Sequence, residues 1–348
     1  MFADLINIIQ IDLTNFDFSS VIDLTYFFGG CSSLKSIDLS NVNAENVKYM
    51  NSMFFGCRSL VSINFANFKT KNLETLEMCF EGCESLVSID LSSFETPNLL
   101  ILSNFLYKCY SLKYINLNSF DTSKVTFMNG MFSNCKSLVS LNLSNFKTGA
   151  LRNTQEMFDQ CNSLISIDLS SFYTPSLINI FKMFYNCSNL IYLDISNFNT
   201  SSVVDMGQVF DQCWSIKSLD LTHFNTDSAS SIWHMFYNCF NLEYLDISSF
   251  NTSIITNLDG LFNECQSLKS INLSNFNTSL VERMDGMFLN CKNLEIVDLS
   301  SFKTASVKKM EIMFKGCYAL KSLDLKNFYT PNLESMHECF VTVKNWNI

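Results

Sequence analysis

The sequence predicts an α/β solenoid of about 13 similar coils, with a parallel β-sheet on one face and short helices or helical turns on the other. Three observations predict it: a unit of 26 residues recurs along the chain, each unit contains one short alternating apolar segment, and each contains one segment with helical apolar spacing. Because neither the period nor the composition changes along the chain, we expect one solenoid domain over residues 1–348.

Cysteine marks the period. Twelve cysteines lie 26 residues apart with no insertion or deletion between them: Cys31, Cys57, Cys83, Cys109, Cys135, Cys161, Cys187, Cys213, Cys239, Cys265, Cys291 and Cys317. The other two, Cys79 and Cys339, stand where Met53 and Met131 stand in other units. Free cysteine is often buried, and no histidine recurs beside these positions, so we expect a ladder of buried thiols and neither disulfides nor metal sites.

Each unit continues from its cysteine as Cys-x-x-Leu-x-x-Ile-x-Leu-x-x-Phe-x-Thr. In the second unit these positions are Cys57, Leu60, Ile63, Phe65, Phe68 and Thr70. The Ile-x-Leu alternation has a period of two, which is typical of a short strand with one buried face. Strands from successive coils, stacked in register about 4.8 Å apart, would form one long parallel sheet.

A threonine then recurs at one position of the unit: Thr70, Thr96, Thr122, Thr148, Thr174, Thr200, Thr226, Thr252, Thr278, Thr304 and Thr330. Its side-chain oxygen is of the kind that caps helices, and the chain's three prolines each directly follow one of these threonines. Apolar residues such as Val125, Met128 and Phe132 follow at helical spacing. The residue before the cysteine is Gly or Asn in eight units, which predicts a left-handed residue where the short helix ends.

Composition excludes several classes of function. The net charge is −10 with only three arginines, which argues against a nucleic-acid partner and favours a cationic one. No apolar run reaches the roughly 18 residues of a membrane span. The unit contains no phosphate-binding loop, no metal-spaced histidines and no nucleophile elbow, so we expect neither an enzyme nor a cofactor.

The unit Met-Phe-x-x-Cys-x-Ser-Leu-x-Ser-Ile-Asp-Leu-Ser-x-Phe-x-Thr resembles the repeat of the BspA-type leucine-rich-repeat surface proteins. Its Leu-x-x-Ile-x-Leu-x-x-Phe segment is similar to the leucine-rich-repeat strand motif, with Phe or Val where Asn or Cys is common. The resemblance covers essentially the whole chain. It implies a leucine-rich-repeat solenoid on a microbial cell surface that adheres to host matrix proteins or to other cells. The start of the chain has an acidic residue where a signal peptide has a positive one, so the cytoplasm is the alternative location.

One outward strand position is acidic or amide in every unit: Asp12, Asp38, Asn64, Asp90, Asn116, Asn142, Asp168, Asp194, Asp220, Asp246, Asn272, Asp298 and Asp324. Carboxylates stacked about 5 Å apart repel each other by about 1 kcal/mol in water. One interpretation is that serine hydroxyls and water solvate the row. The other is that the unbroken run Asp168, Asp194, Asp220 and Asp246 binds Ca²⁺ or another hard cation.

Tyrosines interrupt the serine row two residues before this position, at Tyr114, Tyr192 and Tyr244. Exposed aromatic residues beside charges are typical anchors of a protein-binding face. The alternative is that tyrosine replaces serine wherever space permits.

The sequence thus favours a non-enzymatic binding or adhesion scaffold, whose partner-binding residues are Tyr114, Tyr192, Tyr244, Asp168, Asp194, Asp220 and Asp246. The alternative is a structural protein. Phe2 and Phe340 are both in phase with the repeat, so uncapped ends could stack head to tail into a homo-oligomer, unless Trp346 and Ile348 shield the last coil.

Overall fold

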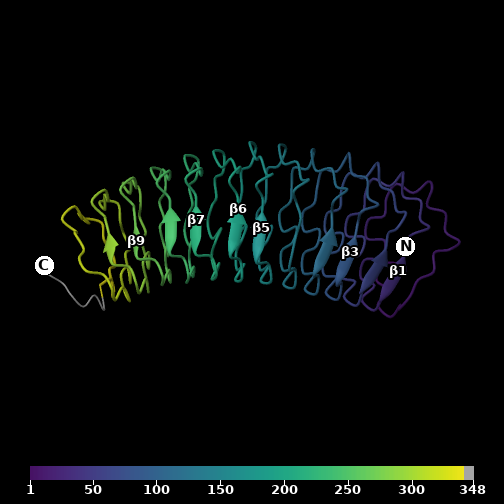
Figure 1. The fold of residues 1–348 in the computed structure, drawn as a ribbon, viewed down its shortest axis with the longest axis horizontal. Coiled ribbons are helices and arrows are strands. Elements are labelled where there is room, and N and C mark those ends of the chain that lie inside the picture. The colour runs from purple at the N-terminus through teal and green to yellow at the C-terminus, as the bar shows by residue number, and fades with distance from the viewer. Residues whose placement is uncertain (341–348) are drawn as a thin grey trace. The chain divides into compact units, whose positions relative to one another are not determined.

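The computed structural model describes residues 1–340. Ten short strands recur along them: β1 (Ser36–Asp38), β2 (Ser62–Asn64), β3 (Ser88–Asp90), β4 (Tyr114–Asn116), β5 (Ser166–Asp168), β6 (Tyr192–Asp194), β7 (Ser218–Asp220), β8 (Tyr244–Asp246), β9 (Ser270–Ile271) and β10 (Ile296–Val297). They lie at the alternating segment of the unit, and their inward residues are mostly buried. The chain is therefore a solenoid with parallel strands (Figure 1).

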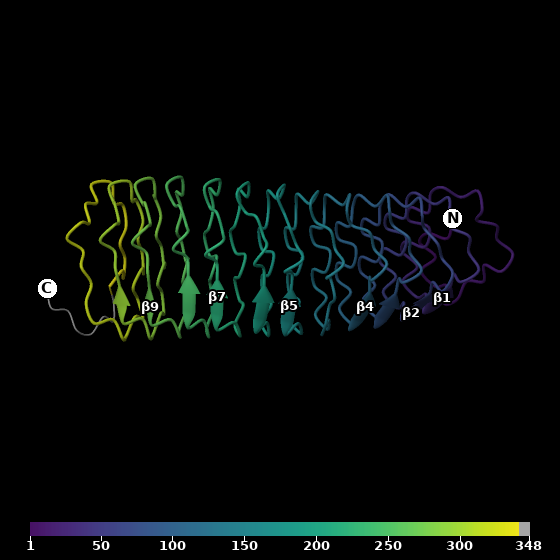
Figure 2. The same ribbon diagram turned by 45° about the horizontal axis from the view of Figure 1, so that its top comes forward.

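The coils fall into two compact units. Unit 1 contains Met1–Ser176 and Tyr192–Asn197, and unit 2 contains Leu177–Ile191 and the residues from Phe198 onward. In each unit, the strands lie along one side of the coils (Figure 2). We call this the strand side, and we call the side formed by the residues just before each cysteine the turn side.

The expected long sheet is wrong. Within residues 1–340 the strands form five separate parallel pairs, β1 with β2, β3 with β4, β5 with β6, β7 with β8 and β9 with β10. Each pair is in register at the repeat spacing, so that Asp168 faces Asp194 and Asp220 faces Asp246. A strand of two or three residues offers few N–H and C=O groups to each neighbour, so the ladder breaks at small changes in spacing between coils.

The expected short helices are also wrong, because no α-helix or 3₁₀-helix occurs anywhere in residues 1–340. The N–H of Phe28 donates to the carbonyl of Met53 in the next coil over 2.9 Å, and that of Gly30 donates to Phe55 over 2.7 Å. Between them, the N–H of Gly29 bonds back to the carbonyl of Tyr26 in the same coil. Since alternate N–H groups bond to the next coil, the ladder of bonds that defines a helix cannot form.

Two positions in each coil have left-handed backbone, which turns the chain repeatedly. One is the residue before each of the twelve cysteines, as the Gly and Asn pattern predicts: Gly30, Gly56, Gly82, Lys108, Asn134, Gln160, Asn186, Gln212, Asn238, Glu264, Asn290 and Gly316. The other lies four residues earlier, where most units have a residue other than glycine, such as Tyr26, Ser52 or Met78, and three have Gly130, Gly260 or Gly286. Left-handed residues at intervals of four reproduce a near-helical spacing of buried side chains without a helix.

The recurring threonine does not cap a helix. The hydroxyl of Thr226 donates to the carbonyl of Asn251 over 2.9 Å and accepts the N–H of the same residue over 2.7 Å. Thr122 makes the same pair of bonds with Lys147. The threonine hydroxyl therefore bonds to both the N–H and the C=O of one residue in the next coil. The threonine side chain is buried, so these two backbone groups have a partner where water does not reach them.

The core consists of stacked columns. All fourteen cysteines are free and buried, which confirms the thiol ladder. Phenylalanines three residues before them stack between coils, as Phe28 does on Phe54 with ring centroids 5.2 Å apart and Phe210 on Phe236 at 5.8 Å. These columns fix the register between coils, and the register decides which side chains meet on the strand side.

Candidate functional site

Each Asp or Asn of the outward strand position closes the turn that follows it. The carboxylate of Asp246 accepts the N–H of Ser248 over 3.0 Å, and that of Asp220 accepts both the N–H and the hydroxyl of Thr222. These bonds lower the pKa of Asp246, chiefly through the backbone N–H, and that of Asp220, chiefly through the hydroxyl. The carboxylates are therefore charged at neutral pH, and the role of this position in every coil is first a local one.

Strand pairing sorts this row into two kinds of contact. In the pair β1 and β2 the amide of Asn64 donates to Asp38 over 3.0 Å, and in β3 and β4 the amide of Asn116 donates to Asp90 over 3.0 Å. In each of these two pairs the carboxylate therefore faces a hydrogen-bond donor instead of a second negative charge.

Two further pairs, β5 with β6 and β7 with β8, place carboxylate against carboxylate, at Asp168 with Asp194 and at Asp220 with Asp246. Neither member of such a pair can donate a hydrogen bond when ionised, so the two negative charges face each other across adjacent strands. The run of four acids predicted from the sequence is therefore present as two pairs, one in each unit.

A tyrosine accompanies each carboxylate pair. Tyr192 is 55% exposed and its hydroxyl donates to Asp194 over 3.3 Å, while Tyr244 is 60% exposed and donates to Asp246 over 3.5 Å. The negative charge of Asp194 raises the pKa of Tyr192. We call Asp168, Tyr192 and Asp194 the first acidic triplet, and Asp220, Tyr244 and Asp246 the second acidic triplet.

Tyr114 belongs to neither triplet. It is 56% exposed and faces Ser88, in the strand pair in which Asn116 bonds to Asp90. Asp90, Tyr114 and Asn116 therefore repeat the geometry of an acidic triplet with one carboxylate replaced by an amide, and we call them the amide triplet.

A hollow of about 300 Å³ adjoins the second acidic triplet. Tyr244, Asp246, Ser270 and Asn272 contribute to its lining, together with Glu243. Glu243 forms an ion pair with Lys217 over 3.6 Å. The hollow thus combines one exposed ring, carboxylates and neutral polar groups.

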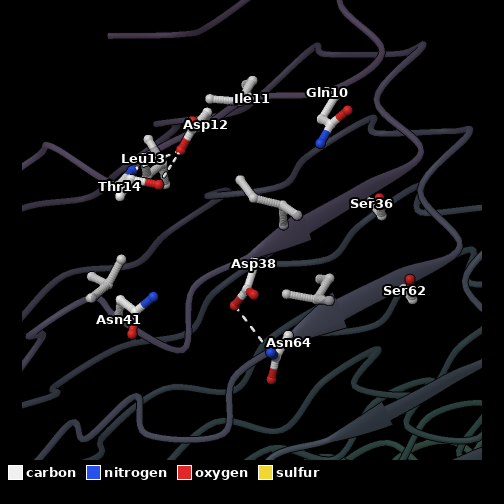
Figure 3. Close-up of a pocket in the computed structure, with 13 residues that line it drawn as sticks. Gln10, Ile11, Asp12, Leu13, Thr14, Ser36, Asp38, Asn41, Ser62 and Asn64 are labelled. Atoms are coloured by element: carbon white, nitrogen blue, oxygen red, sulfur yellow. Dashed lines mark hydrogen bonds between the residues drawn. The ribbon is translucent and has the colours of Figure 1, made fainter.

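A second hollow, of about 430 Å³, lies on the strand side of unit 1 beside β1 and β2. Figure 3 shows Asp12, Asp38 and Asn64 around it, with Asp12 bonded to Thr14 and Asp38 to Asn64. Its labelled lining includes no aromatic residue, and its carboxylates already accept hydrogen bonds from their neighbours. It therefore lacks the features that distinguish the acidic triplets.

The turn side of unit 2 carries an aromatic cluster that the sequence did not suggest. Trp233 packs on His234, and His234 stacks on Tyr237 with centroids 4.5 Å apart. A side chain at Gly207 or Gly260 would collide with Trp233 or His234, respectively. The sequence signal that could have revealed the cluster is the presence of glycine at Gly207 and Gly260, each 26 residues from one of the aromatic residues Trp233 and His234.

Asp211 lies on the same side and is only 2% exposed. One oxygen accepts the amide of Gln208 over 2.9 Å, whereas Oδ1 has no hydrogen-bond partner. Burial raises the pKa of Asp211 to about 6. A buried acid of this kind costs stability once it ionises.

The cation interpretation finds no ligand set. In the part of the chain that the structure describes, no group of three or more His, Cys, Asp or Glu side chains could hold a metal ion. Over the same residues, no helix has the length and apolar character that crossing a bilayer would need.

Comparison with known proteins places the chain in a repeat family. The family described as "Mycoplasma protein of unknown function, DUF285" matches residues 1–114, 74–191, 164–244 and 231–348. No curated protein matches the chain.

Two solved structures illustrate the likeness. A leucine-rich cell surface protein from Faecalibacterium prausnitzii A2-165 is 19% identical, with a TM-score of 0.44 over 85% of this chain and 74% of that chain. A leucine-rich repeat protein from Bacteroides ovatus ATCC 8483 is 23% identical, with a TM-score of 0.40 over 87% of this chain and 82% of that chain.

Proposed function

The chain belongs to the family described as "Mycoplasma protein of unknown function, DUF285", and we propose that it is a non-enzymatic scaffold that holds a protein partner on its strand side. The observation that carries this proposal is the exposure of Tyr192 and Tyr244 beside paired carboxylates. Rigid, exposed aromatic rings are common anchors at protein interfaces, since they bury a large area at a small entropic cost.

Further support comes from the loss of stability that two facing carboxylates in adjacent strands are expected to cause. The chain uses an amide against a carboxylate in β1 with β2 and in β3 with β4, so the fold does not require two facing carboxylates. Like charges in adjacent strands disfavour folding. A feature that lowers stability where a better local choice exists is typical of a functional surface.

The proposed location is the cell surface, where adhesion to host matrix proteins or other cells would take place. This rests on the resemblance of the 26-residue unit to BspA-type repeats. The cytoplasm is the alternative location. Protease treatment of intact cells distinguishes the two, because a surface protein is degraded and a cytoplasmic one survives.

The partner-binding test compares wild type with the Tyr192→Ser, Tyr244→Ser double variant in binding to immobilised matrix proteins and to whole cells. Serine occupies the same position in β5 and β7, so the variant should fold. We expect binding to fall at least about tenfold, as for loss of two interface anchors. The Tyr114→Ser variant is the comparison, because Tyr114 was also predicted to bind the partner but lies beside a carboxylate that already accepts an amide hydrogen bond. Equal binding by wild type and the double variant would contradict the proposal.

A second candidate function is head-to-tail assembly. Leu5 occupies the position of the buried cysteines in the first coil, yet it is exposed, as are Ile6, Ile9 and Phe16 in the same coil. Another copy stacked on this coil would cover these residues. Trp346 and Ile348, the predicted shield of the last coil, lie outside the described residues. Light scattering over a range of concentrations tests assembly, and a constant monomer mass would contradict it.

A further inference from the structure

We infer that the strand side of unit 1 binds an amphipathic α-helix of the partner, laid along a row of exposed aliphatic side chains. The inference rests on the proposed function and names the form and chemistry of the partner segment that makes the contact. The row occupies the position that directly precedes the strand segment of each coil, and we call its members the aliphatic row: Val61, Val87, Val139 and Ile165.

The aliphatic row is exposed along unit 1. Ile165 is 56% exposed and Val61 is 48% exposed, although both side chains are hydrocarbons. Hydrogen bonds between successive coils hold members of the row side by side. The N–H of Lys113 donates to the carbonyl of Val87 over 2.8 Å, and the N–H of Val139 donates to the carbonyl of Lys113 over 3.4 Å. From Val61 to Ile165, Lys113 alone interrupts the aliphatic residues at this position.

The fold does not require aliphatic residues at this position. In unit 2 the same position is charged in five successive coils: Lys217, Glu243, Lys269, Glu295 and Lys321. Lys217 pairs with Glu243 over 3.6 Å, and Lys321 pairs with Glu295. Ile191 is aliphatic as well but belongs to unit 2. An exposed aliphatic row at a position that accommodates ion pairs elsewhere is typical of a surface that another molecule covers.

The spacing of the coils favours a helix over an extended segment as the occupant. Stacked rings in unit 1 have centroids 5.2 Å apart at Phe28 and Phe54 and 5.7 Å apart at Phe132 and Phe158. An α-helix rises about 5.4 Å per turn, so one side chain per turn can meet each coil. Residues on one face of a strand lie about 6.7 Å apart, so a partner strand would lose register by about 5 Å over four coil intervals.

Charges specify the remaining positions of the helix. Lys113 stands in the middle of the aliphatic row, so an acidic residue of the partner is expected at that turn. Outward carboxylates follow three residues after aliphatic ones, as Asp90 follows Val87 and Asp168 follows Ile165. Basic residues along one flank of the helix would face these carboxylates. The partner helix therefore has one aliphatic residue per turn in four of five turns, an acidic residue at the third turn and a basic flank.

The test measures the binding of labelled synthetic peptides to the full chain by fluorescence anisotropy. The helical probe is an alanine-based helix of about five turns, with leucine at one position per turn, glutamate at that position in the third turn and lysine along one flank. A scrambled probe has the same composition with its leucines spread around the helix. We expect the helical probe to bind at least about tenfold more tightly. Equal binding of the scrambled probe, or of an extended peptide with leucine at every second residue, would overturn the inference.

The Val139→Lys, Ile165→Glu variant removes two members of the aliphatic row. It places in two neighbouring coils the charges that Lys217 and Glu243 pair in unit 2, so the variant should fold. Binding of the helical probe should fall at least about tenfold, since two apolar contacts are lost. Unchanged binding would contradict the inference.

The matched control is Ile22→Glu, Leu100→Lys. It removes two exposed aliphatic side chains and introduces the same charges, but at the position that precedes the isolated bridges of unit 1. Lys48 and Glu74 form an ion pair at this position over 3.2 Å, so the control should fold as well. Binding of the helical probe should stay unchanged. An equal loss in both variants would show that the peptide binds exposed apolar surface without preference for the aliphatic row.

Lys113→Glu tests the register of the helix. The helical probe should bind this variant about threefold more weakly, and a probe with lysine at the third turn should bind it more tightly by a similar factor. If the variant does not distinguish the two probes, the inferred position of the helix is wrong. Light scattering examines a second copy as the occupant. A mass that doubles in wild type and not in Val139→Lys, Ile165→Glu would assign the aliphatic row to self-association and overturn the inference.

Failure of the inference can be told apart from failure of the proposed function. If the Tyr192→Ser, Tyr244→Ser variant loses partner binding while Val139→Lys, Ile165→Glu keeps it, the scaffold proposal stands and the helix site is wrong. If the helical probe binds as expected and the partner still binds the tyrosine double variant, the proposed tyrosine anchors are wrong and the helix site stands.

Discussion

The thiol of Cys239 donates a hydrogen bond to the main-chain carbonyl of Phe210, 29 residues earlier, over 3.1 Å. The same bond joins Cys57 to Phe28 and Cys291 to Phe262. Burial raises the pKa of Cys239 further above the range in which a thiolate forms. Cysteine recurs because it is small and apolar and still offers one donor to the preceding coil, so the ladder is structural.

This bond predicts the effect of Cys239→Ala. Alanine loses both the donor and the buried sulfur, so unfolding in urea should require about 1–2 kcal/mol less than in wild type. Cys239→Ser, which keeps a donor, should lose less than Cys239→Ala. If alanine were as stable as cysteine, the sulfur–carbonyl bond would contribute nothing to the stack.

Replacing a residue of the recurring threonine position, such as Thr226, should lower the free energy of unfolding more than replacing Cys239 does. Thr226→Val preserves shape but leaves the N–H and C=O of Asn251 without the hydroxyl that both use. We expect a loss of about 2–3 kcal/mol, since two hydrogen bonds at a buried side chain disappear. Thr226→Ser keeps the hydroxyl and should recover most of the stability. Equal losses in the two variants would mean that the methyl group matters more than the hydroxyl.

Alanine substitution at three glycines can distinguish the cost of left-handed backbone from the cost of a steric clash. Gly149 has open space and no left-handed backbone, Gly56 is left-handed with open space, and Gly260 is left-handed with His234 only 2.4 Å from an added Cβ. Substitution by alanine should be nearly neutral at Gly149, cost about 1 kcal/mol at Gly56 and cost about 2 kcal/mol or more at Gly260. Thermal unfolding measures the order, and equal costs at Gly56 and Gly260 would show that His234 moves aside freely.

Asp211 predicts a pH effect. Its pKa is raised from 3.8 to about 6 in the folded protein, so the folded state holds the proton more tightly than the unfolded state does. The resulting stability is present below about pH 4 and is lost as the pH rises through 6. The gain of Asp211→Asn over wild type should therefore grow by about 2–3 kcal/mol between pH 4 and pH 7. Urea unfolding of both proteins across this range is the measurement. Parallel curves would contradict the raised pKa.

The second acidic triplet predicts a stabilising substitution. Asp246→Asn removes one of two facing charges and places an amide where Asn116 already donates to Asp90. We expect a small gain in stability, larger at low salt because screening weakens the repulsion that the substitution removes. Asp90→Asn should give no gain, since an amide already relieves that carboxylate. A loss of stability in Asp246→Asn would show that the facing charges do not strain the strand pair.

Much of the fold could be predicted because identical positions must occupy equivalent places in a regular stack. The buried cysteines, the alternating strand segment and the left-handed residue before Cys57 or Cys135 all follow from residue type and period. The helices could not be excluded, since Val125, Met128 and Phe132 have the spacing of a helix. The N–H groups of this segment can donate either to carbonyls of their own coil or to carbonyls of the next coil, and the sequence does not show which acceptor is used.

The candidate site divides in the same way. The sequence identified the acidic row and its three tyrosines, but it treated Asp168 to Asp246 as one run. Because the strands pair two by two, this run is divided into two acidic triplets. Tyr114 lies in a different strand pair, next to the amide of Asn116. The cluster around Trp233 depends on rings that cross from coil to coil over glycines, and no periodic pattern encodes such an exception.

The sequence by itself determined the 26-residue period, the residues that fill the core and the side chains that point outward, because burial of a repeated apolar pattern leaves one stacking solution. The tertiary structure decided which backbone groups pair and which side chains become neighbours. The physical reason is that hydrogen bonds between coils compete with those within a coil on nearly equal terms. The contacts of Phe28 with Met53 and of Asp220 with Asp246 record the outcome of that competition.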